Sequence, residues 1–149
     1  MTSKLFLFND ANLILGERKL SSLAEARPSR RRLDTVWDGG AVKFCLEQAP
    51  WNFAMQSVEL THSPSIDPAF GFQFAFDKPT DWCRTFMVSG DETFTCPLLQ
   101  YEDQGAYWYA DVDPLYVRYV SDDTAFGGDL SLWSENFTQY VAHYFAWKA

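Results

Sequence analysis

The stretch of sequence that decides the fold spans residues 33–54 and reads LDTVWDGGAVKFCLEQAPWNFA. Its apolar and small residues recur at the spacing of three and four that marks one face of an α-helix. They are Leu33, Val36, Trp37, Gly40, Ala41, Phe44 and Cys45. Pro28 suits the first turn of this helix, because its missing N–H would have no helical partner there. We therefore expect one long helix that begins near Pro28.

The end of this helix is set by Pro50. A helix cannot continue through proline, and the ring also pushes Ala49 out of the helical region. The chain then passes directly into Trp51 and Phe53, which we expect to hold the corner in the core. The predicted structural anchors are Trp37, Pro50, Trp51 and Phe53.

Two further helices are expected, one at each end of the sequence. Apolar residues from Leu7 to Leu15 form a helical stripe that ends at Gly16, a candidate left-handed cap. A last helix follows Gly127-Gly128, with Asp129 as its expected N-cap. Its stripe comprises Leu130, Trp133, Phe137, Tyr140, Val141, Tyr144 and Phe145.

Between these helices the apolar period changes to two, which indicates β-strands. The alternating Phe70, Phe72, Phe74 and Phe76 predict one strand. Others are expected over residues 55–61, 84–89, 92–95, 107–110 and 115–120, with Gly90-Asp91 as a turn. The predicted fold is therefore α+β: a three-helix core with an inserted antiparallel β-rich lobe. We expect a single domain over residues 1–149, with 1–50 and 128–149 in the helical lobe and 51–127 in the β-rich lobe.

The charge of this chain is unevenly distributed. Residues 1–50 hold eight Lys and Arg against six Asp and Glu, whereas residues 51–149 hold four against fourteen. The second part has a net charge of −10 and would repel phosphates. It is therefore a poor candidate for binding nucleic acid. Aromatic residues make up 17% of the chain, a share that favours assembly or an aromatic β-rich core.

The sequence contains no pattern typical of a metal, cofactor or catalytic site. Cys45, Cys83 and Cys96 form no CxxC pair and are expected to be reduced thiols. His62 and His143 are isolated from metal-ligand patterns. No apolar run approaches membrane-spanning length. We expect a protein without catalytic residues, metal or cofactor that is not an enzyme and does not bind membranes.

Two alternatives remain open from the residues alone. Glycoside hydrolysis needs two carboxyl groups about 5 to 10 Å apart. The candidates for such a pair are Asp91/Glu92, Glu102/Asp103 and Asp122/Asp123. A carbohydrate-binding or receptor-binding module would instead use an aromatic platform. That platform would comprise Tyr101, Tyr107, Trp108, Tyr109 and Asp111.

The only basic cluster is Arg27, Arg30, Arg31 and Arg32, at the start of the long helix. Cations are unfavourable at a helix N-terminus. We therefore expect these arginines to pair with carboxylates of a neighbouring subunit or another partner. From the last helix, Tyr140, Tyr144 and Trp147 are further candidates for intermolecular contacts.

Several short motifs together resemble the head–tail adaptor of short-tailed phages, the tail tubular protein A family. The most specific is LEQAPWNFA at residues 46–54, which is similar to that family's Pro-Trp-x-Phe-Ala corner. The others are NDANLILG at 9–16, LSSL at 20–23, FAFDKPTDW at 74–82, DPLYVRYV at 113–120, and Trp133 with Phe137.

This resemblance implies a structural protein of the virion tail or neck, assembled in the cytoplasm of the bacterial host. Copies would form a ring, expected to be dodecameric, beneath the portal protein. The helical lobe would meet the portal, and the β-rich lobe would point to the downstream tail or nozzle protein. DNA would pass through the ring only as cargo.

Overall fold

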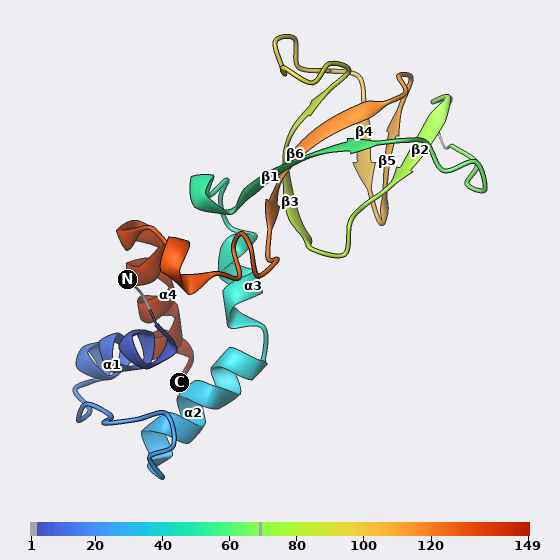
Figure 1. Cartoon of the computed structure of the whole chain (residues 1–149). Helices are drawn as coiled ribbons and strands as arrows, with labels where there is room; N and C mark the ends of the chain where they lie inside the picture. The colour runs from blue at the N-terminus through green and yellow to red at the C-terminus, as the bar shows by residue number, and fades with distance from the viewer. Residues whose placement is uncertain (1–2, 69) are drawn as a thin grey trace.

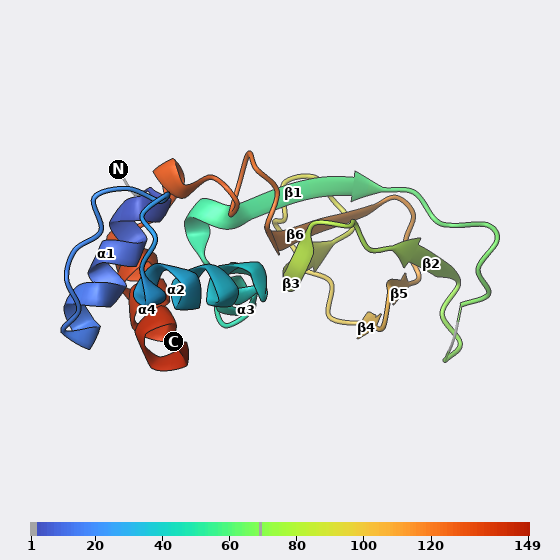
Figure 2. The same ribbon diagram turned by 90° about the horizontal axis from the view of Figure 1, so that it is seen from below.

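A computed structural model describes residues 3–68 and 70–149 of the chain. The polypeptide forms a helical lobe and a β-rich lobe, which lie at opposite ends of an elongated molecule (Figures 1 and 2). The helical lobe comprises α1 (Lys4–Leu15), α2 (Pro28–Asp38), α3 (Ala41–Leu46) and α4 (Glu135–Lys148). Short 3-10 helices, η1 (Asn52–Ala54) and η2 (Leu130–Leu132), lie near the connections between the lobes.

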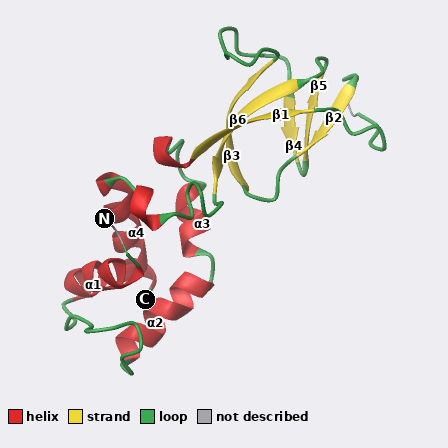
Figure 3. Cartoon of the chain, in the orientation of Figure 1, coloured by secondary structure: helices red, strands yellow, loops and turns green. Residues whose placement is uncertain are grey.

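The β-rich lobe contains two three-stranded antiparallel sheets (Figure 3). The first has the order β1 (Met55–Leu60), β6 (Leu115–Ser121), β3 (Trp82–Ser89). The second has the order β2 (Phe74–Asp77), β5 (Tyr107–Ala110), β4 (Glu102–Gln104). Phe76 and Trp108 from the second sheet pack with Val88 and Val117 from the first, so the two sheets share one core.

The α+β class agrees with the prediction, but the expected three-helix core is wrong. The described residues form four helices, all of them short, beside a β-rich part with two sheets. The predicted long helix is divided into α2 and α3 at Gly39-Gly40. Gly40 has a φ of 86°, in the left-handed region, and forms the N-cap of α3. A periodic apolar pattern continued across this break, but two adjacent glycines carry little helix propensity and permit the turn.

The helix boundaries match several of the local expectations. Pro28 occupies the first turn of α2, and Gly16 caps α1 with a φ of 77°, as predicted. Asp129, however, does not cap the last helix. Its carboxylate accepts a hydrogen bond from Ser131 N in η2, and Ser134 forms the N-cap of α4 instead. The extended backbone of Trp133 separates the two elements.

The strands are shorter than the alternation of phenylalanines predicted. β2 begins only at Phe74, because Phe70 has a φ of 58°, which no β-strand accommodates. Residues 92–95 form no strand either. The Asp91 carboxylate accepts hydrogen bonds from the hydroxyls of Ser89, Thr93 and Thr95, and these local bonds replace strand pairing.

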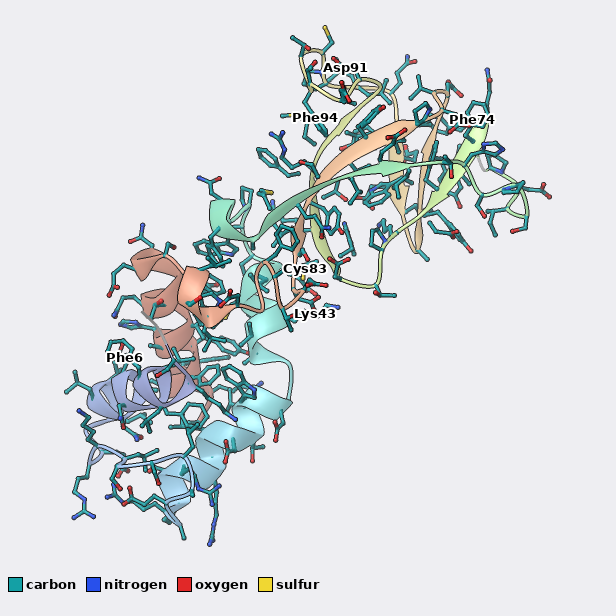
Figure 4. The ribbon with its side chains drawn as sticks, in the orientation of Figure 1. Phe6, Lys43, Phe74, Cys83, Asp91 and Phe94 are labelled. Carbon is teal, nitrogen blue, oxygen red and sulfur yellow. The ribbon has the colours of Figure 1, made fainter. Side chains whose placement is uncertain are left out.

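The two lobes are joined where the first sheet meets the helices. Ala54, Cys83 and Val120 belong to the core of the helical lobe, together with Leu46 of α3. Figure 4 shows Cys83 beside Lys43 at this junction. β6 therefore contributes to both cores, with Val117 and Tyr119 in one and Val120 in the other.

Candidate functional site

The helical lobe exposes a continuous group of aromatic side chains on α3 and α4. Phe44, Tyr140, Tyr144 and Trp147 form this group, which we call the α4 aromatic surface. Phe44 stacks on Tyr144 with ring centroids 4.9 Å apart, and Tyr144 lies 5.9 Å from Trp147. Trp147 is 76% exposed. Solvent-exposed aromatic clusters of this kind are typical of interaction sites.

The helical period explains why α4 presents this surface. Tyr140, Tyr144 and Trp147 recur every three to four residues and therefore share one side of the helix. The adjoining side buries Phe137, Val141 and Phe145 in the core, and Tyr144, at the border between the two sides, packs partly against that core. The apolar part of α4 is therefore wider than the core covers, and it leaves Tyr140 and Trp147 exposed.

Polar and basic groups border the α4 aromatic surface. Asn136, Gln139 and His143 line a shallow groove of about 470 Å³ with Tyr140, Tyr144 and Trp147. The Nζ of Lys148 lies 5.9 Å from the Trp147 ring centroid. Among the described residues no acidic side chain lines this groove, but Glu135 lies beside it and accepts a hydrogen bond from Gln139 at 3.4 Å. The surface is thus aromatic at its centre and polar at its edge.

The predicted anchors lie around the helical core. Trp37 packs between Phe8 and Phe145, with ring centroids 6.3 and 6.1 Å away. Trp51 donates its Nε1–H to the carbonyl of Cys45 at 2.9 Å. Trp51 therefore ties the end of α3 to the segment that leads into β1, and the role of these residues as anchors stays a prediction.

Trp51 and Phe53 both contact Phe137 of α4, with ring centroids 4.8 and 4.9 Å away. Pro50 itself is exposed. Its contribution is to the path of the chain and not to the buried core.

The basic cluster finds carboxylates within its own chain. Arg27 pairs with Glu25, Arg30 Nη1 lies 2.9 Å from Asp34, and Arg32 Nη2 lies 3.6 Å from Glu17. Among the described residues, Arg31 alone of the four forms no ion pair. Pairing with a partner's carboxylates stays a prediction, but three of these arginines do not depend on it for neutralisation.

The aromatic platform that the alternative of a carbohydrate-binding module requires is not assembled. Trp108 is fully buried, and its Nε1–H is bonded to Thr85 Oγ1 at 3.0 Å. Tyr107 and Tyr109 project from the other side of β5 with their rings inclined by 41°. A sugar ring needs an exposed flat aromatic face, which the central tryptophan does not offer here.

The remaining polar side chains include two local pairs among the described residues. His62 Nδ1 lies 2.7 Å from Asp113 Oδ2, but no hydroxyl or thiol of the described residues is hydrogen-bonded to its Nε2. Asp103 pairs with Lys78. Within the described part of the chain, no group of three or more His, Cys, Asp or Glu side chains could hold a metal ion.

The three cysteines are free thiols. Burial raises the pKa of Cys45 and Cys83 to about 12, which makes them poor nucleophiles at neutral pH. Among the described residues, no helix is long and apolar enough to cross a membrane.

Two exposed apolar regions were not predicted from the sequence. Phe44 was assigned to the buried side of a long helix, yet it is exposed and belongs to the α4 aromatic surface. The outer side of α1 also carries exposed apolar residues, among them Phe6 and Leu13. The sequence already contained a signal for the exposed side of α1. Its apolar residues lie on more than one side of the helix, whereas a helix that packs against a core on one side needs only one apolar stripe.

No protein-family model matches this chain, and no curated protein matches it either. Its function must therefore be argued from its own surfaces.

Proposed function

We propose that this chain is a structural head–tail adaptor of a short-tailed phage, which acts by assembly and not by catalysis. Copies would form a ring between the portal and the tail and line the channel for DNA. The observation that carries this proposal is the α4 aromatic surface. Tyr144 packs partly against the helical core, but Phe44, Tyr140 and Trp147 are exposed, and exposing them to water is unfavourable unless a partner covers them.

The two lobes suit two different partners. We assign the portal contact to the helical lobe, where Arg31 is available for a partner's carboxylates. The downstream tail or nozzle protein would contact the β-rich lobe. The localisation that follows is the neck or tail of the virion.

The acidic charge of residues 51–149 fits a surface past which DNA slides. Carboxylates repel phosphates, so a channel lined by them does not retain DNA as it passes. We propose that part of this charge faces the channel of the ring. Acidic residues found only on the outer wall of the assembled ring would contradict this arrangement.

Native mass spectrometry of the purified chain, alone and mixed with portal rings, tests the proposal. A ring, or a monomer that joins the portal in a stoichiometry matching its symmetry, is the expected result. Trp147→Asp should abolish this assembly, whereas Leu99→Asp should not, since Leu99 is 90% exposed but lies outside the α4 aromatic surface. A monomer that ignores the portal would contradict the proposal, and a glycan array would then test sugar binding.

A further inference from the structure

The outer edge of β1 has no strand beside it. β1 pairs with β6 over all six of its residues without a register shift. Among the described residues, no backbone group outside β6 is hydrogen-bonded to the backbone of β1. Figure 2 shows β1 along the outer side of the β-rich lobe. An edge of this kind presents a row of unpaired N–H and C=O groups, which the backbone of a further strand can bind.

The other three sheet edges are covered, interrupted or short. On β3, the Val88 carbonyl accepts the Leu98 N–H at 2.7 Å, and two register shifts interrupt the pairing with β6. On β2, the Ala75 carbonyl accepts the Ser63 N–H at 2.8 Å. β4 has only three residues, of which two are acidic. β1 contains neither proline nor lysine, which often protect an edge, so it is the edge in the described part of the chain that best suits an added strand.

Residues 92–95, which we call the donor segment, have a strand-forming sequence but form no strand. Alternating threonine and phenylalanine favour extended backbone. Phe94 instead has a φ of 55°, in the left-handed region, which is unfavourable for so large a side chain. The two threonine hydroxyls bind Asp91, and the Phe94 ring centroid lies 4.6 Å from Arg118 Cζ (Figure 4 labels Phe94 and Asp91). An extended donor segment would relieve the strain at Phe94.

The donor segment cannot add to β1 of its own chain. Ser89 and Pro97, on either side of it, form a β-bridge, so both of its ends are held at β3. β6 lies between β3 and β1, and a strand added outside β1 would be about 14 Å from β3 at the usual strand spacing. Residues 90–96 would have to run out and return, and they reach only about 12 Å when fully extended. The β1 edge of another copy is not subject to this limit.

We infer that, on assembly, the donor segment of one copy becomes extended and adds to the β1 edge of the next copy. The inference rests on the proposed function, because it assumes that the chain assembles with itself. The donor segment lies beside β3, and the acceptor is β1 at the opposite edge of the same sheet. Such a head-to-tail contact generates a closed ring when the rotation between neighbours closes. The contacts with Asp91 and Arg118 are exchanged for backbone hydrogen bonds, so loop and strand are alternative states of the donor segment.

The side chains of the two segments are compatible in this arrangement. Side chains alternate across a strand, so Phe94 would lie on one face of the sheet and the two threonines on the other. Val58 and Leu60 of β1 pack partly against the β core, which Phe94 would extend on that face. Ser57 and Glu59 are exposed on the other face. Glu59 forms no ion pair among the described residues, and its carboxylate can accept hydrogen bonds from the threonine hydroxyls.

Disulfide cross-linking tests the contact in the full chain with Cys96→Ser, in which the two remaining cysteines are buried. Thr95→Cys places a thiol in the donor segment, and Ser57→Cys or Glu59→Cys places one on the same face of β1. The assembled protein, alone or bound to portal rings, is a mixture of the donor variant with either β1 variant. At least one mixture should give a disulfide-linked dimer. Leu99→Cys replaces the donor variant as the control and should give none, since Leu99 is 90% exposed but lies outside the donor segment.

Phe94→Gly and Phe94→Val separate the loop state from the strand state. Both substitutions remove the ring, but glycine accepts a left-handed φ, whereas the β-branched valine favours extended backbone. The valine variant should therefore assemble at a concentration about tenfold lower than the glycine variant, as measured by sedimentation velocity or by portal binding. Circular dichroism checks that both variants fold.

Three results would overturn the inference: a chain that stays monomeric with and without portal rings, an assembly that gives neither cross-link, or equal assembly of the two Phe94 variants. The first result would also contradict the adaptor proposal. The second and third would leave that proposal standing, because a ring can form through other contacts. The failure of the strand addition is therefore distinguishable from the failure of the function.

Discussion

Trp51 joins the end of α3 to α4 through two kinds of contact. Its indole N–H satisfies the Cys45 carbonyl near the C-terminus of α3, and its ring packs edge-on against Phe137. A helix end leaves carbonyls without intrahelical partners, so a side-chain donor placed there stabilises the turn. The corner therefore depends on one residue that acts at once as cap and as core contact.

We expect Trp51→Ala to lower the free energy of unfolding by about 3 kcal/mol, the low end for a large aromatic because the ring is only partly buried. Trp51→Phe keeps a ring against Phe137 and removes the indole donor, while the Gln48 N–H still donates to the Cys45 carbonyl at 3.2 Å, so the cost should stay below about 1 kcal/mol. Urea unfolding measures both changes. An alanine variant as stable as the unaltered chain would show that the corner does not hold the fold.

Asp91 gives the loop after β3 a dependence on pH. The Ser89 hydroxyl first, then those of Thr93 and Thr95, lower the pKa of Asp91 from 3.8 to about 2. A carboxyl with a lowered pKa in the folded state stabilises that state above its ordinary pKa and loses the effect as pH falls toward 2. The stabilisation should therefore be complete above about pH 4 and disappear near pH 2.

Asp91→Asn should remove this dependence. The difference in the free energy of unfolding between the two proteins should be largest at neutral pH and shrink toward zero near pH 2. Urea unfolding at several pH values measures it. A difference that stays constant with pH would contradict the assignment of the effect to the Asp91 charge.

At the scale of elements, the connection from β6 to α4 passes through a point where no side chain fits. A Cβ on Gly127 would lie 2.3 Å from the Ser121 carbonyl oxygen and 3.1 Å from the Ala54 Cβ. The Gly127 carbonyl also accepts the indole N–H of Trp133 at 2.9 Å. This close approach lets the connection pack against the junction of the two lobes.

Gly127→Ala should therefore lower the midpoint of thermal unfolding, with a cost of about 3 kcal/mol for the displaced backbone. Gly90→Ala is the matched control. Its Cβ would have ordinary contacts of 3.8 Å or more with Val112, so its effect should stay within about 0.5 kcal/mol. Equal effects of the two substitutions would contradict the packing argument.

At the scale of the whole molecule, the two lobes share β6 and part of the first sheet. Val120 lies in the helical core, while Val117 and Tyr119 lie in the β core. Loss of either core would remove support from the same strand. The predicted single domain over residues 1–149 stays a prediction, and this shared strand is its physical basis.

We expect one cooperative unfolding transition for the whole chain. Urea unfolding followed by far-ultraviolet circular dichroism, which reports mostly the helices, should coincide with unfolding followed by tryptophan fluorescence from both lobes. Two separated transitions would show that the helical and β-rich lobes fold independently.

The sequence alone determined the local signals of this protein. Proline and glycine placed the start of α2 and the end of α1, and the alternation of apolar residues placed β1, β5 and most of β6. These features depend on neighbours along the chain, whose backbone preferences are readable without tertiary contacts. The aromatic residues of the last helix were likewise found by their spacing.

Only the tertiary structure decided which apolar residues are covered. The pattern did not reveal that Gly39-Gly40 divides the helix or that Phe44 is exposed. Burial depends on which elements meet, and that is settled by contacts between residues far apart in the chain. For this reason only the tertiary structure showed that Phe44 of α3 stacks on Tyr144 and so joins the α4 aromatic surface.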